Sequence, residues 1–210
     1  MFQRWLSRQQ PLWLVGTFFL IAVAMTSSHP GGLLDMTQQA FSQIGTALAK
    51  KFPDDQQEMF QAAIASAAKI APTLVAYTWI LIAIVSMAAA QNILRQRKWN
   101  LRDNFSLLNL RLPPQLIYGV ATTGLFGVFA PAPYDYIGRN LSLILGFPFF
   151  FVGLAVFHAW AASIKYPGFF LVAFYVVLTF IPWMALIVAV IGVVDQWVDF
   201  RKRIALKTTV

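Results

Sequence analysis

Three long, predominantly apolar runs contain no Asp, Glu, Lys or Arg: residues 70–90, 140–163 and 169–194. The hydrocarbon core of a bilayer is about 30 Å thick, and about 20 apolar residues cross it as a helix. Backbone groups in lipid must be hydrogen-bonded within the chain, which favours helices. The sequence therefore predicts an all-α, polytopic membrane helix bundle.

Charged residues are scarce and predominantly basic. They make up 11% of the chain, compared with about 25% in an average soluble domain. The 16 Lys and Arg residues against 8 Asp and Glu residues give a net charge of +8. Basic residues beside apolar spans orient membrane proteins, so we expect the lipid bilayer, and no nucleic acid, as a partner. The absence of cysteine excludes disulfides and thiolate chemistry.

Two shorter apolar runs, at residues 12–26 and 115–131, predict further spans within a single transmembrane domain covering residues 1–210. Residues 27–69 are expected to be an extramembrane helical insertion. Its residues 33–51 form an amphipathic segment that is too polar to span and is placed on the periplasmic membrane surface. N-cap chemistry is expected at Asp54 and Asp55 before a helix that starts at Gln56. Pro72 is expected to bend the second span.

The run at residues 169–194 is interrupted by Pro182 and can be read as one span or two. As a single helix its 26 residues reach about 39 Å, which is long for one upright span and short for two. With two spans the protein has six membrane segments, and twelve of the 16 basic residues share the side of both termini. With five segments the basic residues divide evenly. The positive-inside rule therefore favours six membrane segments with both termini cytoplasmic in the bacterial inner membrane, with five as the alternative.

Six polar side chains are candidates for a ligand pocket at membrane depth: His158, Tyr118, Thr122, Thr123, Tyr77 and Tyr175. Ionisable groups inside lipid are costly, which makes His158 the leading candidate. If the chain binds a ligand, at least three of the six should line one cavity of about 300 Å³ or more. If it is a packing subunit, they should be dispersed and bonded locally. A structural histidine at a helix end and aromatic residues at the membrane interface are the alternative interpretations.

Small residues at helical spacing indicate close helix packing. Ala63, Ala67 and Ala71 recur every four residues, as do Gly119, Thr123 and Gly127 in the third span. Asp135, Arg139 and Asn140 are predicted to form a polar cluster at the outer mouth, where an ion pair or interfacial anchor is favoured over substrate binding.

No catalytic motif is present in the sequence. The two histidines, His29 and His158, cannot by themselves form a metal site. We therefore expect no enzymatic activity, no metal and no cofactor.

The C-terminal segment predicts a helix leaving the membrane, with Asp195 and Asp199 one turn apart and pairing between Asp and Arg side chains of the same helix. Its pattern consists of Gly192, Asp195, Trp197, Asp199, Arg201 and Arg203. Together with residues 145–158, this ending resembles the YybS-like bacterial membrane proteins of unknown function, over residues 70–203. The resemblance implies kinship to the six-helix substrate-binding subunits of energy-coupling-factor vitamin transporters.

Two functions follow from these observations. The first prediction, implied by the resemblance, is a small-molecule binding or transport subunit, although the spans contain few polar groups for a hydrophilic ligand. The alternative is a non-catalytic structural or assembly subunit that packs against other membrane proteins.

The charge distribution yields a direct prediction about topology. A reporter fused after Val210 should report a cytoplasmic location, because that placement gives the twelve-to-four division of basic residues. Paired alkaline phosphatase and green fluorescent protein fusions provide the measurement. A periplasmic readout would overturn the six-segment topology.

Overall fold

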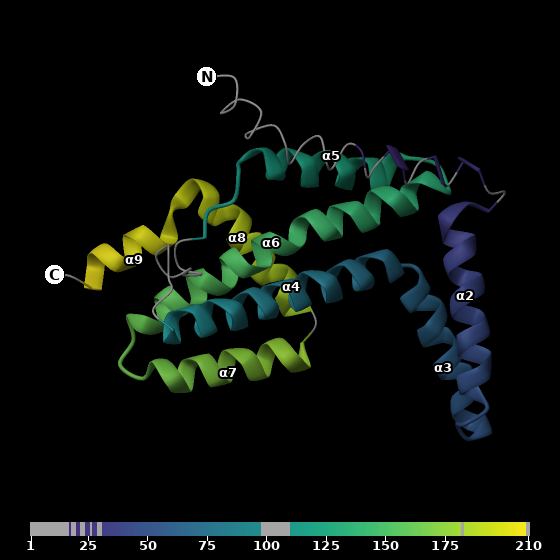
Figure 1. Cartoon of the computed structure of the whole chain (residues 1–210), viewed down its shortest axis with the longest axis horizontal. Coiled ribbons are helices and arrows are strands. Elements are labelled where there is room, and N and C mark those ends of the chain that lie inside the picture. Colours follow the sequence, from purple (N-terminus) through teal and green to yellow (C-terminus); the bar gives the residue numbers. More distant parts are fainter. Residues whose placement is uncertain are drawn as a thin grey trace. The chain divides into compact units, whose positions relative to one another are not determined.

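The computed structural model describes residues 31–97, 110–181 and 183–208, together with Thr17, Leu20, Ile21, Ala24, Met25, Ser27 and Ser28. These residues form helices and no strand, which confirms the predicted all-α class (Figure 1). In chain order the helices are α2 (Gly32–Ala49), α3 (Asp54–Ala68), α4 (Ala71–Gln96), α5 (Gln115–Phe129), α6 (Tyr134–Ala162), α7 (Pro167–Phe180), α8 (Trp183–Val198) and α9 (Phe200–Thr208).

Two helices in the described residues, α4 and α6, are long and apolar enough to cross a membrane. Helices α7 and α8 pass the same test only as a pair, bent by more than 40° where they meet, and α5 is apolar but has 15 residues. The described residues therefore contain two span candidates, or three if the bent pair is one span, and they do not support six. The predicted span at residues 12–26 lies outside the described residues except for five helical positions, Thr17, Leu20, Ile21, Ala24 and Met25.

One predicted helix boundary and one predicted bend differ from the structure. Helix α3 begins at Asp54 rather than Gln56, and Pro53 is its N-cap, with no side-chain hydrogen bond. Asp54 and Asp55 lie in the first turn of α3, where their negative charges interact favourably with the positive end of the helix dipole. Pro72 is the second residue of α4, where a missing N–H costs nothing, so it does not bend a continuous span.

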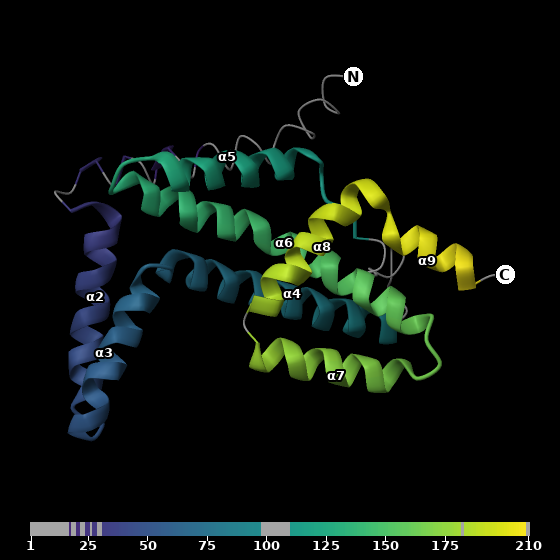
Figure 2. The ribbon, with the colours of Figure 1, turned by 180° about the vertical axis from the view of Figure 1, so that it is seen from behind.

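The contacts divide the chain into two compact units, Met1–Leu81 with Tyr118–Ile144 and Ile82–Ile117 with Leu145–Val210. Helices α4, α5 and α6 each contain residues of both units. In the first unit, α2 and α3 lie side by side as a hairpin, as Figures 1 and 2 both show. Gly45 of α2 is buried, and a Cβ atom there would lie 3.0 Å from Ile64 Cγ2 of α3. The absence of a side chain at Gly45 thus permits the close approach of α2 and α3.

Glycine also permits a close crossing of α5 and α6 in the first unit. A Cβ on Gly127 would lie 2.5 Å from the backbone nitrogen of Arg139, and one on Gly138 would lie 2.4 Å from the nitrogen of Gly127. Both values are below the separation that real Cβ atoms adopt. Gly127 and Thr123 are buried, in agreement with the predicted small-residue row in the third span.

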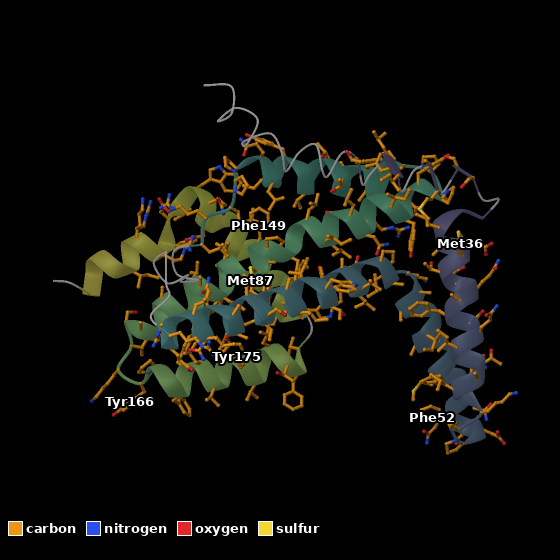
Figure 3. The ribbon with its side chains drawn as sticks, viewed as in Figure 1. Met36, Phe52, Met87, Phe149, Tyr166 and Tyr175 are labelled. Carbon is orange, nitrogen blue, oxygen red and sulfur yellow. The ribbon has the colours of Figure 1, made fainter. Side chains whose placement is uncertain are left out.

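The second unit contains a still closer crossing of α6 and α8. A Cβ on Gly153 would lie 1.9 Å from the carbonyl oxygen of Val188, and one on Gly192 would lie 1.9 Å from that of Phe149. Val188 is fully buried, and Phe149, labelled in Figure 3, is 1% exposed. Lipid tails are as apolar as the side chains, so the hydrophobic effect does not drive helices together within the membrane. Helix association there depends on van der Waals packing, which such close backbone approach improves.

We expect Gly153→Ala to lower the free energy of unfolding by about 1–3 kcal/mol, because the methyl group collides with a backbone carbonyl that no rotamer change can move. Gly146→Ala in the same helix is the matched control, since a Cβ there meets nothing within 4 Å. That control should be neutral or stabilising by at most about 1 kcal/mol. Unfolding by a dodecyl sulfate titration in mixed micelles measures both, and equal losses would contradict the packing described.

Candidate functional site

A buried polar cluster of the first unit lies beside the turn between α3 and α4. Lys69 and Ile70 separate the two helices, so the last carbonyls of α3 and the first N–H groups of α4 need partners from elsewhere. Asn140 of α6 supplies partners for Lys69 and Thr73. Its Nδ2 donates to the carbonyl oxygen of Lys69 at 3.1 Å and to that of Tyr136 at 3.0 Å. Its Oδ1 accepts from the backbone N–H of Thr73 at 3.3 Å and from Thr73 Oγ1 at 2.7 Å.

Tyr136 reinforces this junction from one turn earlier in α6. Its hydroxyl donates to the carbonyl oxygen of Ala68 at 3.1 Å and lies 3.1 Å from Thr37 Oγ1 of α2. Tyr136 is 3% exposed, Asn140 4% and Thr73 2%. The first turns of α6 thereby bind α2, the end of α3 and the start of α4 through buried hydrogen bonds.

The predicted polar mouth cluster is divided in the structure. Arg139 forms an ion pair with Asp135 along α6, and the Arg139 side chain is 60% exposed. Asn140 instead points into the buried junction. Adjacent helical residues point in directions about 100° apart, which explains why neighbours in sequence serve different faces. Sequence reasoning missed Tyr136 and Thr73, although the spacing of four between Tyr136 and Asn140 is a signal for a shared face.

Four pocket candidates lie in the first unit. Thr122 Oγ1 donates to the carbonyl oxygen of Tyr118 at 2.8 Å, and Thr123 Oγ1 donates to that of Gly119 at 2.7 Å, both within α5. Tyr77 of α4 donates to the carbonyl oxygen of Leu143 at 2.9 Å. Tyr118 is 71% exposed. Three of the four hydroxyls thus bond to the chain's own backbone.

The other two candidates, His158 and Tyr175, meet in the second unit. His158 Nδ1 lies 2.8 Å from the carbonyl oxygen of Leu154, which only accepts, so this nitrogen carries a proton. His158 Nε2 lies 3.4 Å from the hydroxyl of Tyr175 on α7, which is labelled in Figure 3. Phe157 and Phe174 stack beside them with ring centroids 4.3 Å apart. The pair connects α6 to α7 within an aromatic contact.

A cavity of about 380 Å³ lies on the α2–α3 hairpin of the first unit. None of the six pocket candidates lines it. The lining residues are Gln38, Phe41, Ser42, Gly45, Thr46, Gln61, Ile64 and Ala65. No group of three or more His, Cys, Asp or Glu side chains that could hold a metal ion occurs among the described residues.

The three packing alanines do not share one helix. Ala63 and Ala67 belong to α3, whereas Ala71 opens α4 after the turn. Ala63 is exposed, and Ala71 is 4% exposed. The turn at Lys69 and Ile70 interrupts the row because the chain changes direction there, which a repeat of four residues cannot reveal.

The C-terminal segment is not the continuous helix that its sequence predicts. Helix α8 ends at Val198 and α9 begins at Phe200, because Asp199 adopts a left-handed conformation with φ of 51°. Asp195 therefore pairs with Arg201, whose Nε lies 2.8 Å from Oδ2. Asp199 pairs with Arg111 and with Lys202, each at 3.3 Å. The ion pairs join three segments, and none of them is the predicted pairing of Asp and Arg within one helix.

Comparison with known proteins identifies one match. The model of the family described as "Predicted membrane protein (DUF2232)" matches residues 11–196 of the chain. No curated protein and no solved structure matches it.

Replacing Asn140 with Leu should lower the free energy of unfolding by about 2–3 kcal/mol, because the buried N–H of Thr73 and the carbonyl oxygen of Lys69 lose their partner. Thr122→Val is the control, since its hydroxyl is exposed and bonds within its own helix. The control should change stability by less than about 0.5 kcal/mol. Detergent unfolding followed by circular dichroism measures both, and a neutral Asn140→Leu variant would refute the role of the junction.

Proposed function

The chain belongs to the DUF2232 family of predicted membrane proteins, and from this premise we propose that it is a non-catalytic structural or assembly subunit of a membrane protein complex. As a membrane-embedded helical protein it contacts the lipid bilayer. The observation that supports the assembly role is the local bonding of the candidate pocket side chains.

A binding subunit needs polar groups that converge on a vacant volume. Here Tyr77, Thr122, Thr123 and His158 bond to backbone oxygens of the chain itself. Tyr175 contacts His158, and Tyr118 is exposed. Side chains bonded in this way lower the cost of placing polar groups in lipid and stiffen the helices that carry them.

The close helix crossings add a second argument. Four glycines, Gly127, Gly138, Gly153 and Gly192, permit backbone contact that brings the helices close together at these crossings. A scaffold on which other membrane proteins assemble requires such fixed helices.

We also propose that the chain lies in the bacterial inner membrane with both termini cytoplasmic and six membrane segments, and that it is related to the YybS-like proteins. The twelve basic residues on the side of the termini support this orientation. The alternative function is a vitamin-binding transport subunit. It is supported by the resemblance of residues 70–203 to the YybS-like proteins and by the kinship to energy-coupling-factor substrate-binding subunits that this resemblance implies.

The test compares the two functions. A saturating ligand stabilises its binding protein, by about 2.7 kcal/mol at a concentration of 100 Kd. We expect a panel of water-soluble vitamins to leave the unfolding midpoint of the purified chain unchanged. We expect His158→Ala to cost about 1 kcal/mol, the value of one hydrogen bond.

In native membranes extracted with a mild detergent, the chain should migrate in native gels well above the purified 23.5 kDa protein. Migration at the position of the purified protein would overturn the assembly role. A vitamin-dependent shift that His158→Ala abolishes would establish the transport alternative instead.

A further inference from the structure

The end of α8 and the start of α9 join an apolar helix to a basic one. Trp197, in the last turn of α8, is 68% exposed. Helix α9 opens with Phe200 and the basic residues Arg201, Lys202 and Arg203. Exposed tryptophan followed by clustered basic residues is typical of a helix end at the membrane–water interface.

One of these basic residues is neutralised inside the second unit. The Asp195 side chain is fully buried, and it accepts from Arg201 Nε at 2.8 Å. The Arg201 side chain is 13% exposed, and its guanidinium also donates to the carbonyl oxygen of Leu110 at 2.9 Å. Arg201 therefore holds α9 and the segment at Leu110 against the end of α8, and its charge does not face outward.

Three other basic side chains remain at the surface of this elbow, and we refer to them as the elbow cations: Arg111, Lys202 and Arg203. The side chains of Arg111 and Lys202 are 64% and 62% exposed. Both pair with Asp199, whose side chain is 42% exposed. Arg203 is exposed and has no ion-pair partner among the described residues. Three positive charges against one carboxylate leave an excess of positive charge at the elbow.

Asp199 determines both the shape and the charge of the elbow. Its left-handed backbone separates α8 from α9, and its carbonyl oxygen accepts from the backbone N–H groups of Lys202 and Arg203 at 3.1 and 3.2 Å. Its carboxylate competes with any external anion for Arg111 and Lys202. Removing the Asp199 carboxylate while keeping its backbone conformation should therefore increase the affinity of the elbow for an external anion.

We propose that the elbow cations form a docking surface for the headgroups of anionic phospholipids. Trp197 and the apolar α8 place this surface at headgroup depth, and the phosphate oxygens of the lipid are the complementary anions. The inference goes beyond the assembly role, since it assigns the lipid class that surrounds this end of the protein.

Vesicles of defined composition test the proposal with the full-length chain. Because the sequence contains no cysteine, Val194→Cys provides a single labelling site on α8, at a residue that is 37% exposed. The labelled protein is reconstituted into phosphatidylcholine vesicles containing a trace of either phosphatidylglycerol or phosphatidylcholine with the same acyl-chain acceptor. Energy transfer should be higher with phosphatidylglycerol, and this excess should decrease in 0.5 M NaCl.

Two variants change the surface in opposite directions. Arg203→Gln should reduce the phosphatidylglycerol excess about three- to fivefold, and Asp199→Asn should increase it by a similar factor. Asparagine tolerates the left-handed backbone at this position, so α8 and α9 should keep their boundary. Lys51→Gln, which removes one exposed positive charge from the α2–α3 turn, is the matched control and should have no effect.

The proposal fails if phosphatidylglycerol shows no excess over phosphatidylcholine, or if Lys51→Gln reduces the excess as much as Arg203→Gln. It also fails if inorganic phosphate lowers the excess more than NaCl at equal ionic strength, since the elbow would then bind free phosphate. Circular dichroism of each variant excludes loss of the fold as the cause.

Discussion

The structure of the first unit depends on satisfying backbone polar groups at a break between two helices. A helix end buried without partners costs several kcal/mol for each unpaired group in an apolar environment. Asn140 meets this requirement with one side chain, since its amide both donates to Lys69 and accepts from Thr73. Tyr136 satisfies the next carbonyl, that of Ala68. Ala68 and Thr73, on either side of the turn, can be buried because α6 carries Asn140 and Tyr136 one turn apart.

A second constraint is the close approach of backbones at glycine. Helix α6 meets α5 through Gly138 and meets α8 through Gly153, each within its own unit. Helices that are already in the membrane gain nothing from burial away from water when they associate. Van der Waals attraction over closely packed surfaces is therefore a main contribution to their association. The polar junction and the glycine crossings therefore complement each other: one fixes a turn, and the other fixes helix axes.

The regular parts of this fold could be predicted from the sequence. The uncharged runs at 70–90 and 140–163 correspond to α4 and α6. They could be predicted because a long apolar run indicates a helix from neighbouring residues alone. The interruption that the sequence predicts at Pro182 agrees with the end of α7 at Phe180 and the start of α8 at Trp183, since proline cannot continue the hydrogen-bonding pattern of a helix. The break at Asp199 could not be predicted, because no Gly or Pro occurs there, and the ion pair of Asp199 with Arg111 joins residues 88 positions apart. The role of Asn140 likewise depends on residues about 70 positions away.

That separation has a consequence for the order of events during synthesis. Asn140 lies 71 positions after Lys69 and 67 after Thr73. At about 5–20 residues per second, the ribosome adds such a stretch in roughly 4–14 seconds. During this interval the α3–α4 turn has been synthesised, whereas its hydrogen-bonding partner Asn140 has not. The hydrogen bonds of Asn140 to Lys69 and Thr73 can form only after the start of α6 has been synthesised, so the junction of the first unit is completed by its later helix.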